Sequence, residues 1–254
     1  MRNKMRHYEI LSKDPIIAEY LPETRWCSSK SLIELLNKYQ MIYLKPNDNT
    51  GGNGIIRVTL IDKDACLISN ENNSKKVDLS NLVSVLKQLI PSTSKYIVQQ
   101  GIDIATYNNR PFDMRIVLNR VLKIWRATLT SAKVATTSEA IVTNVAKGAE
   151  DYLLHSILQQ YDQSKEPMAT FRDIIDLSHQ IAQTLGSQLP LLTIGLDLAL
   201  DKSGRLWFIE ANEKPECRRC KLVNDEASVR KYEMAKSLMQ RSQKHNASLS
   251  IRRK

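Results

Sequence analysis

Two stretches of the chain combine residue types that could bind a nucleotide. The first, residues 43–55, reads YLKPNDNTGGNGI, in which a strand-like segment reaches Lys45 and then enters a polar loop with Gly51, Gly52 and Gly54. Glycine lets backbone N–H groups approach an anion closely, and a lysine ammonium can pair with phosphate. The chemistry that this stretch indicates is therefore phosphate binding.

The order of parts in this loop excludes the two best-known nucleotide loops. A P-loop places its lysine after the glycines and opens a helix. The Rossmann fingerprint spaces its glycines differently and is also followed by a helix. Here Lys45 comes first, and the β-branched segment IIRVTLI (55–61) follows. We therefore expect a hairpin whose tip folds over phosphates, the alternative being an ordinary turn rich in Asn and Gly.

The second stretch, GLDLALDKSGRLWFIEAN (195–212), sets hard oxygen ligands among apolar residues. Glu210 and Asn212 are two residues apart, so they point to the same face of a strand, where their oxygens can converge with those of Asp197. A carboxylate inside GLDLAL would be costly to bury without a partner. Because carboxylates and phosphate oxygens suit Mg²⁺, the stretch predicts a magnesium site at these side chains.

Apolar periodicity predicts the elements that must position these residues. Helical spacing indicates helices at 28–39, 79–90, 151–161, 170–189 and 225–243. Apolar, β-branched segments indicate strands at 41–45, 55–61, 96–102, 111–120, 122–135, 192–201 and 205–212. Consecutive strands joined by short turns should pair antiparallel. The expected fold class is α+β, with two modules that divide near residue 101 or 102.

Composition narrows the class of protein further. The chain has 254 residues, of which 42% are hydrophobic, so it can bury a core. It contains no apolar run long enough to span a membrane, and its charged N-terminus is not followed by the apolar segment of a signal peptide. We therefore expect a cytoplasmic protein with no membrane partner.

The four cysteines do not form the framework of a disulfide-stabilised protein. Only Cys217 and Cys220 are close in sequence, and a second pair that would complete a zinc site is absent. The formal net charge of +10 favours anionic partners such as ATP, an acidic peptide or a phosphorylated substrate. The positive charge is diffuse and only 6% of residues are aromatic, which argues against nucleic acid as the partner.

Several segments, taken in chain order, resemble the ATP-grasp superfamily and most closely its YheC/YheD endospore coat-associated branch. They are KPNDNTGGNGI, YIVQQGIDI, RPFDMRIVL, IVTNVAKGA, GLDLALDKSG and FIEANEKPE. The resemblance runs from about Leu21 to about Pro215. It implies an ATP-grasp fold of two α+β subdomains, with mostly antiparallel sheets, that clasp ATP. It also implies a protein that is associated with the spore.

The resemblance implies a division of the chain into four parts. Residues 41–101 would form the first subdomain with a glycine-rich phosphate lid, and residues 102–245 the second subdomain with the magnesium site. Residues 1–40 would be a helical lead-in, too short to build the separate N-terminal domain of most ATP-grasp enzymes, which would be largely absent. Residues 246–254 would be a basic, flexible tail.

The resemblance also assigns roles to individual residues. The implied catalytic residues are Lys45, Arg115, Asn144 and Lys147. Contacts with ATP are implied for Lys45, Thr50, Gly51, Gly52, Asn53, Gly54, Gln99, Gln100, Gly101, Ile102 and Asp113. The implied ligands of two Mg²⁺ ions are Asp197, Glu210 and Asn212. The guanidinium of Arg115 suits bidentate contact with a phosphate or a carboxylate.

The implied activity is that of an ATP- and Mg²⁺-dependent carboxylate–amine ligase that forms ADP. A substrate carboxylate attacks the γ-phosphate to give an acylphosphate, and an amine then displaces phosphate to form an amide. The substrates would be small acids and amines or a peptide or protein carrier. Two alternatives stay open, namely a phosphotransferase on the same fold and a non-catalytic ATP-binding protein associated with the spore coat.

The chain departs from the family pattern at two places. Gly148 is followed by Ala149 where the family has a pair of glycines, and the IEAN segment is followed by Glu213 and Glu216. An extra carboxylate near the expected magnesium site could act as a ligand or could repel substrate. These departures leave the expected ATP site intact and affect the substrate side.

Overall fold

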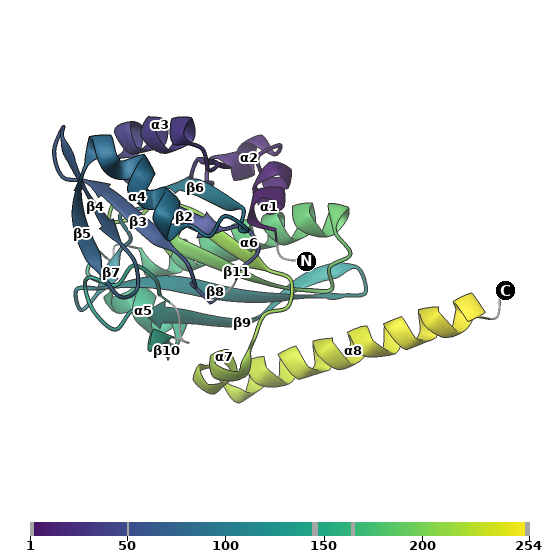
Figure 1. The fold of residues 1–254 in the computed structure, drawn as a ribbon. Coiled ribbons are helices and arrows are strands. Elements are labelled where there is room, and N and C mark those ends of the chain that lie inside the picture. The colour runs from purple at the N-terminus through teal and green to yellow at the C-terminus, as the bar shows by residue number, and fades with distance from the viewer. Residues whose placement is uncertain (1–2, 50, 144–146, 164–165, 252–254) are drawn as a thin grey trace.

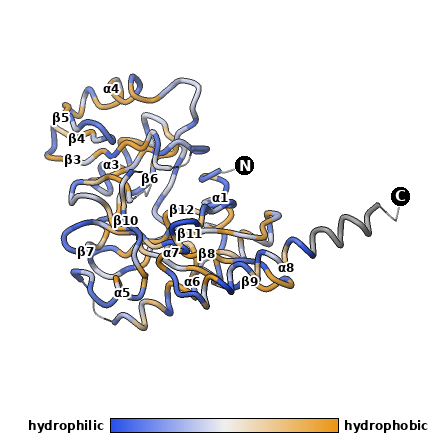
Figure 2. Tube along the Cα trace, turned by 90° about the horizontal axis from the view of Figure 1, so that it is seen from below, coloured by the Kyte–Doolittle hydropathy of each residue, from blue (hydrophilic) through white to orange (hydrophobic). Residues whose placement is uncertain are grey.

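The protein, described by a computed structural model over residues 3–49, 51–143, 147–163 and 166–251, contains two antiparallel sheets with helices packed against them (Figure 1). Each sheet has its own buried hydrophobic cluster. The predicted α+β fold class is therefore confirmed. In Figure 2 the colour changes between hydrophobic and hydrophilic within single strands and within α6, as expected for elements with one buried face.

The first sheet carries the glycine-rich loop. Its strands, in spatial order, are β1 (Thr24–Trp26), β6 (Tyr96–Gln100), β2 (Met41–Pro46), β3 (Ile56–Leu60), β4 (Ala65–Ser69) and β5 (Ser74–Asp78). The helices α3 (Ser29–Tyr39) and α4 (Leu82–Leu89), the latter preceded by the 3-10 turn η1 (Leu79–Asn81), pack on one face. Their leucines in the hydrophobic cluster are Leu32, Leu35, Leu36, Leu82 and Leu86. The opposite face is left for the site.

The second sheet carries most of the charged site residues. Its strands, in spatial order, are β10 (Glu150–Tyr152), β9 (Ile124–Val134), β8 (Arg110–Val121), β11 (Thr193–Leu200) and β12 (Leu206–Asn212), and β7 (Thr106–Tyr107) pairs with β8. The helices that share its main hydrophobic cluster are α1 (Lys4–Leu11), α2 (Pro15–Ala18), α5 (Leu154–Gln160) and α6 (Pro167–Gln188).

Strict alternation along β8 separates the core from the site. Phe112 and Met114 are fully buried in the cluster beneath α6. Asp113 and Arg115, one residue out of phase, point to the other face, where they line a cavity. Farther along this second face, α7 (Arg218–Val223) and the start of α8 (Glu226–Ile251) cover the sheet with Tyr232 and two buried cysteines. A single strand therefore supplies both core and site.

The predicted elements are present, with differences at their ends that have local causes. The helix predicted at 151–161 begins only at Leu154, because residues 150–152 pair with β9 as β10. The helix predicted at 225–243 continues to Ile251, since the intervening sequence contains no glycine or proline that would end it. It runs into the segment predicted as a tail.

Residues 1–40 are not entirely helical. Residues 24–26 form β1, which pairs with β6 at the edge of the first sheet, and α3 packs on the same sheet. By contrast, Leu11 and Ile17 from the first two helices are fully buried in the cluster of the second sheet. The lead-in is thus divided between the two sheets. The boundaries proposed from the sequence stay a prediction.

Candidate active site between the two sheets

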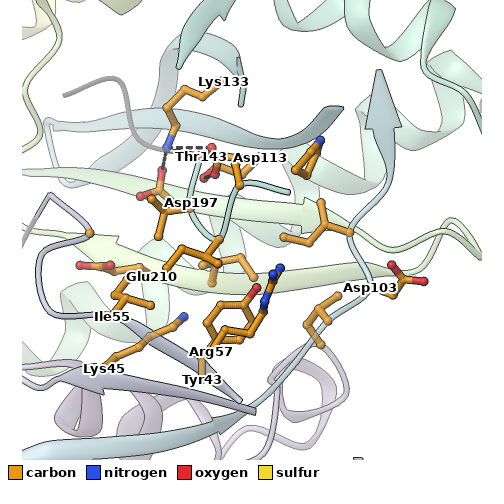
Figure 3. A pocket seen from close by; sticks show the side chains of 18 of the residues that line it. Tyr43, Lys45, Ile55, Arg57, Asp103, Asp113, Lys133, Thr143, Asp197 and Glu210 are labelled. Carbon is orange, nitrogen blue, oxygen red and sulfur yellow. Dashed lines mark hydrogen bonds and ion pairs between the residues drawn. The ribbon is translucent and has the colours of Figure 1, made fainter. Parts of the chain in front are cut away.

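A cavity of about 410 Å³ is lined by strands of both sheets (Figure 3). The predicted site residues that line it are Lys45, Gly51, Gly52, Gln99, Gln100, Ile102, Asp113, Arg115, Asp197, Glu210 and Asn212. Four others do not line it and lie beside it along the chain: Asn53, Gly54, Gly101 and Lys147. Thr50 and Asn144 lie outside the described residues. The fold thus brings residues that are far apart in the chain to one cavity.

Lys45 is buried at the end of β2, with its ammonium in the cavity. Its Nζ donates to Oε1 of Gln99 at 2.6 Å, and Nε2 of Gln99 donates to the Thr24 hydroxyl at 2.9 Å. Burial lowers the pKa of Lys45 to about 8, and the nearby charge of Glu210 only partly opposes this. A buried ammonium held by a neutral amide is ready to pair with an anion that enters the cavity.

The glycine-rich loop after β2 needs its glycines for conformation. Gly51, Gly52 and Gly54 have φ angles of 74°, 75° and 74°, in the left-handed region that disfavours other residues. A Cβ atom on Gly52 would come within 3.5 Å of Val142 and Lys147, which follow β9 in the second subdomain. The loop therefore lies against a segment of the opposite subdomain.

Three buried charged side chains and the partly buried Arg115 form one network on the site face of the second sheet. Arg115 donates two hydrogen bonds to Asp197, from Nε to Oδ1 at 2.6 Å and from Nη2 to Oδ2 at 2.9 Å. Nζ of Lys133 lies 3.1 Å from Oδ1 of Asp197 and 2.7 Å from Oδ1 of Asp113. Strand register causes this grouping, because Asp113 lies opposite Lys133 and Arg115 opposite Asp197.

The two carboxylates of this network have opposite pKa shifts. Burial raises the pKa of Asp113 to about 6, although Lys133 and the hydroxyl of Thr143 act in the opposite direction. Burial alone would also raise the pKa of Asp197, but the charges and hydrogen bonds of Arg115 and Lys133 outweigh it and lower this pKa to about 2. Asp197 is therefore anionic at neutral pH, whereas the raised pKa of Asp113 lies close to neutral pH.

The predicted magnesium ligands are held differently from one another. Both oxygens of Asp197 accept hydrogen bonds, including one from Nδ2 of Asn212 at 3.1 Å. Glu210 lies in the cavity with Nζ of Lys4 at 3.6 Å from its Oε1. Among the described residues, no group of three or more His, Cys, Asp or Glu side chains is arranged to hold a metal ion. The side chains here that could hold Mg²⁺ are Glu210 and, through its amide oxygen, Asn212.

Glu213, one of the departures from the family pattern, does not line the cavity. Its Oε1 lies 3.3 Å from Nε2 of the buried His7 on α1. Burial lowers the pKa of His7, although Glu213 opposes this shift. Glu216, the other departure, is exposed. The extra carboxylates thus have partners or solvent outside the cavity.

Sequence reasoning missed Lys133 and Lys4. A signal for Lys133 was present, because a lysine within the apolar strand TLTSAKVA falls opposite Asp113 once the two strands pair. The sequence around Lys4 gives no indication that this residue belongs to the site. Its Nζ donates to the carbonyl oxygen of Asn49 at 2.6 Å and lies near Glu210, so only the packing of α1 brings it to the glycine-rich loop.

Lys147, predicted as catalytic, forms an ion pair with Glu71 in the turn between β4 and β5. This contact joins the segment after β9 to the first subdomain. Together with the close approach of Gly52 to the same segment, it connects the two subdomains beside the glycine-rich loop. A direct role of Lys147 toward substrate stays a prediction.

The strand that leaves the first subdomain is tightly packed where the hinge is predicted. Gly101 donates its N–H to the carbonyl oxygen of Met41 at 2.8 Å, and a Cβ atom on Gly101 would lie 2.8 Å from that same oxygen. No side chain fits at this point. Glycine is therefore required here for close backbone approach and not for a left-handed conformation.

We expect Gly101→Ala to lower the free energy of unfolding by about 2 kcal/mol or more, since backbone atoms must move to admit the methyl group. Chemical denaturation measures this change. Gly204→Ala is the matched control, because a Cβ there meets nothing within 4 Å and only the positive φ of 89° costs energy, about 1 kcal/mol. Equal losses at the two positions would contradict the packing argument.

The paired subdomains with a cavity between their sheets define the ATP-grasp fold. The D-cycloserine synthetase DcsG superposes with a TM-score of 0.57 at 11% identity, over 93% of this chain and 70% of that protein. The ATP-grasp ligase PsnB, solved with a minimal precursor, superposes with a TM-score of 0.53 at 12% identity, over 94% of this chain and 60% of its own. At such identities the likeness shows the fold alone.

The family follows from the sequence itself. The model of the "YheC/D like ATP-grasp" family matches residues 1–242, so the chain belongs to that family. It is 27% identical to the endospore coat-associated protein YheD of Bacillus subtilis (strain 168) over 84% of this chain, and 24% identical to YheC of the same strain over 87%. The chain spans 48% of YheD and 62% of YheC. None of the described helices has the length and apolar character needed to cross a membrane.

Proposed function

We propose that this protein is an ATP-dependent carboxylate–amine ligase that forms an amide through an acylphosphate. The observation that carries the proposal is the charge distribution of the cavity. Lys45 faces it from the side of the glycine-rich loop, while Arg115, Asp113 and Glu210 face it from the second sheet. Such a cavity can hold a triphosphate between two sets of charged groups.

In this proposal the side chains act by positioning and by charge. Lys45 is buried and has no carboxylate in hydrogen-bonding contact among the described residues, so it pairs with phosphate oxygens when ATP enters. The positive-φ glycines turn backbone N–H groups toward the same phosphates. Glu210 and Asn212 would hold Mg²⁺, which supplies charge neutralisation at the β- and γ-phosphates. To bind the metal, Asp197 would have to give up one of the hydrogen bonds that it accepts from Arg115 or Lys133.

The proposed reaction has two steps. A substrate carboxylate oxygen attacks the γ-phosphorus and ADP leaves, and the amine nitrogen of the second substrate then attacks the acyl carbon, so that phosphate leaves and the amine loses a proton. Arg115, fixed by two hydrogen bonds to Asp197, would orient an anionic substrate group. Binding and orientation of this kind need no protein nucleophile.

Two measurements test the proposal. Calorimetry should show ATP binding that depends on Mg²⁺. If no such binding is detected, the proposal is wrong. With γ-³²P-ATP and a mixture of amino acids, peptides and cell extract, a ligase releases labelled phosphate, whereas a phosphotransferase leaves the label on the acceptor. The gain in mass of the product identifies the acid and the amine, including a peptide or protein carrier.

The lowered pKa of Lys45 predicts a pH dependence of ATP binding. Below about pH 8 the side chain carries a charge in the free protein, and above it the charge is lost, so that protonation has to accompany ATP binding. We expect the Kd for ATP to rise as pH increases above 8, by up to about tenfold per unit. Lys45→Arg, which stays protonated over this range, should remove this dependence. Calorimetry between pH 7 and 9.5 checks both, and equal slopes in the two proteins would contradict the assignment.

A further inference from the structure

The cavity has an apolar part as well as a charged one. Buried and half-buried side chains line it there: Met41, Tyr43, Ile55, Ile102, Ile104 and Ile209. Tyr43 precedes Lys45 by two residues on the same face of β2, which separates them by about 7 Å along the strand. In Figure 3 Tyr43 lies apart from the group formed by Lys133, Asp113 and Asp197. If phosphates lie at Lys45, this apolar part is where a flat nucleobase fits.

Arg57 lies in the apolar part of the cavity. It stands directly opposite Tyr43 in the pairing of β2 with β3, and it lines the cavity. Figure 3 shows its guanidinium beside the Tyr43 hydroxyl. Its Nε is buried and has no hydrogen-bond partner among the described residues. A buried donor of this kind costs stability unless something accepts from it.

The other charged groups nearby have partners. Asp103 at the mouth of the cavity pairs with Lys202, whose Nζ lies 2.9 Å from its Oδ1. Lys45 donates to Gln99. Within the described part of the cavity wall, Arg57 is therefore the cation whose buried donor is left open. What would satisfy it is an acceptor atom on a ligand that fills the apolar part.

We infer that Arg57 donates a hydrogen bond to a ring-nitrogen acceptor of the bound purine and so contributes to the selection of the base. This inference rests on the proposed binding of ATP in the same cavity. The apolar walls select a flat ring, and a fixed donor among them distinguishes rings with an acceptor at that point from rings without one. A phosphate contact is disfavoured, because Arg57 lies opposite Tyr43 and not opposite Lys45.

Base analogues that each lack one acceptor test the inference. The affinities of ATP, 7-deaza-ATP and 3-deaza-ATP are measured by calorimetry for the wild-type protein and for Arg57→Met. We expect the wild-type protein to bind one of the two analogues roughly 10- to 100-fold more weakly than ATP. Arg57→Met should bind ATP as weakly as the wild-type protein binds that analogue, with no further loss for the analogue itself.

Two further variants separate base recognition from general charge and folding. Lys202→Met removes a cation that lines the cavity but is already paired with Asp103. This variant should still bind the analogue more weakly than ATP. Arg57→Lys keeps the charge and loses the planar group of donors, so it should bind ATP at an intermediate affinity. Thermal denaturation of each variant shows whether it is folded.

Three outcomes would overturn the inference. An analogue penalty that is the same in Arg57→Met as in the wild-type protein would show that another group reads the base. A loss of affinity in Arg57→Met that grows from adenosine to ADP to ATP would show that Arg57 contacts the phosphates. Failure of the wild-type protein to bind any adenine nucleotide would overturn both this inference and the proposed function, whereas the first two outcomes leave the proposed function standing.

Discussion

Lys45→Met is expected to weaken the binding of ATP by roughly 100-fold, because it removes a buried charge that pairs with phosphate. Methionine is similar in length to lysine and fills the same space. Since burial lowers the pKa of Lys45, the charged form is disfavoured by folding, and its removal should not lower the free energy of unfolding. The expected result is therefore loss of ATP binding in a protein that stays folded, measured by calorimetry and thermal denaturation.

Asp48→Asn is the matched control for this variant. Asp48 is exposed in the same loop, and its Oδ1 accepts a hydrogen bond from the side chain of Asn47 at 2.6 Å. Its carboxylate is therefore not directed at the cavity, and its neutralisation should change the affinity for ATP by less than about threefold. Equal effects of Lys45→Met and Asp48→Asn would mean that the loop does not bind phosphate through Lys45.

Arg115→Met is expected to lower the free energy of unfolding by about 3 kcal/mol and to abolish activity. It removes two hydrogen bonds from Asp197 and leaves the buried carboxylate with Lys133 as its remaining cation. Breaking a buried ion pair on one side costs about 3–5 kcal/mol, because the other charge stays buried without full compensation. Urea denaturation at neutral pH measures the loss of stability.

The pH dependence of this loss follows from the lowered pKa of Asp197. A carboxyl group whose pKa falls from its ordinary value of 3.8 to about 2 on folding stabilises the folded state above about pH 4, and this contribution disappears as pH falls through 2. The difference between the wild-type protein and Arg115→Met should therefore shrink as pH decreases from 4 to 2. A difference that is constant over this range would show that Arg115 stabilises by packing alone.

The double variant Arg115→Met, Asp197→Leu is the control for buried charge. It removes both partners, so no uncompensated carboxylate stays in the interior, and Lys133 keeps its ion pair with Asp113. We expect it to recover most of the lost stability while activity stays absent. Stability losses that simply add in the double variant would contradict the network described for this face of the sheet.

Much of the fold could be predicted from local pattern. Alternation of apolar residues identified the strands on both sides of the glycine-rich loop, and turn residues between them made their antiparallel pairing the expected arrangement. The helix over residues 170–189 was clear because its leucines and isoleucines recur on one stripe. By contrast, β1 and β10 have three residues each, too few for a periodic signal.

The candidate site was predictable where its residues form local motifs. The sequence by itself determined that Lys45 precedes a glycine-rich turn and that Glu210 and Asn212 share one face of a strand, since these depend only on spacing along the backbone. It also determined the family, through an ordered set of segments. It did not determine which charges pair with one another.

Only the tertiary structure decided the partners of these residues. Strand register placed Lys133 between Asp113 and Asp197, so that the predicted metal ligand Asp197 is held by two cations. Packing of α1 on the second sheet brought Lys4 to the glycine-rich loop and to Glu210. The physical reason is that ion pairs and cavities depend on distances between side chains that are remote in the chain, and those distances exist only after the two sheets have folded and met.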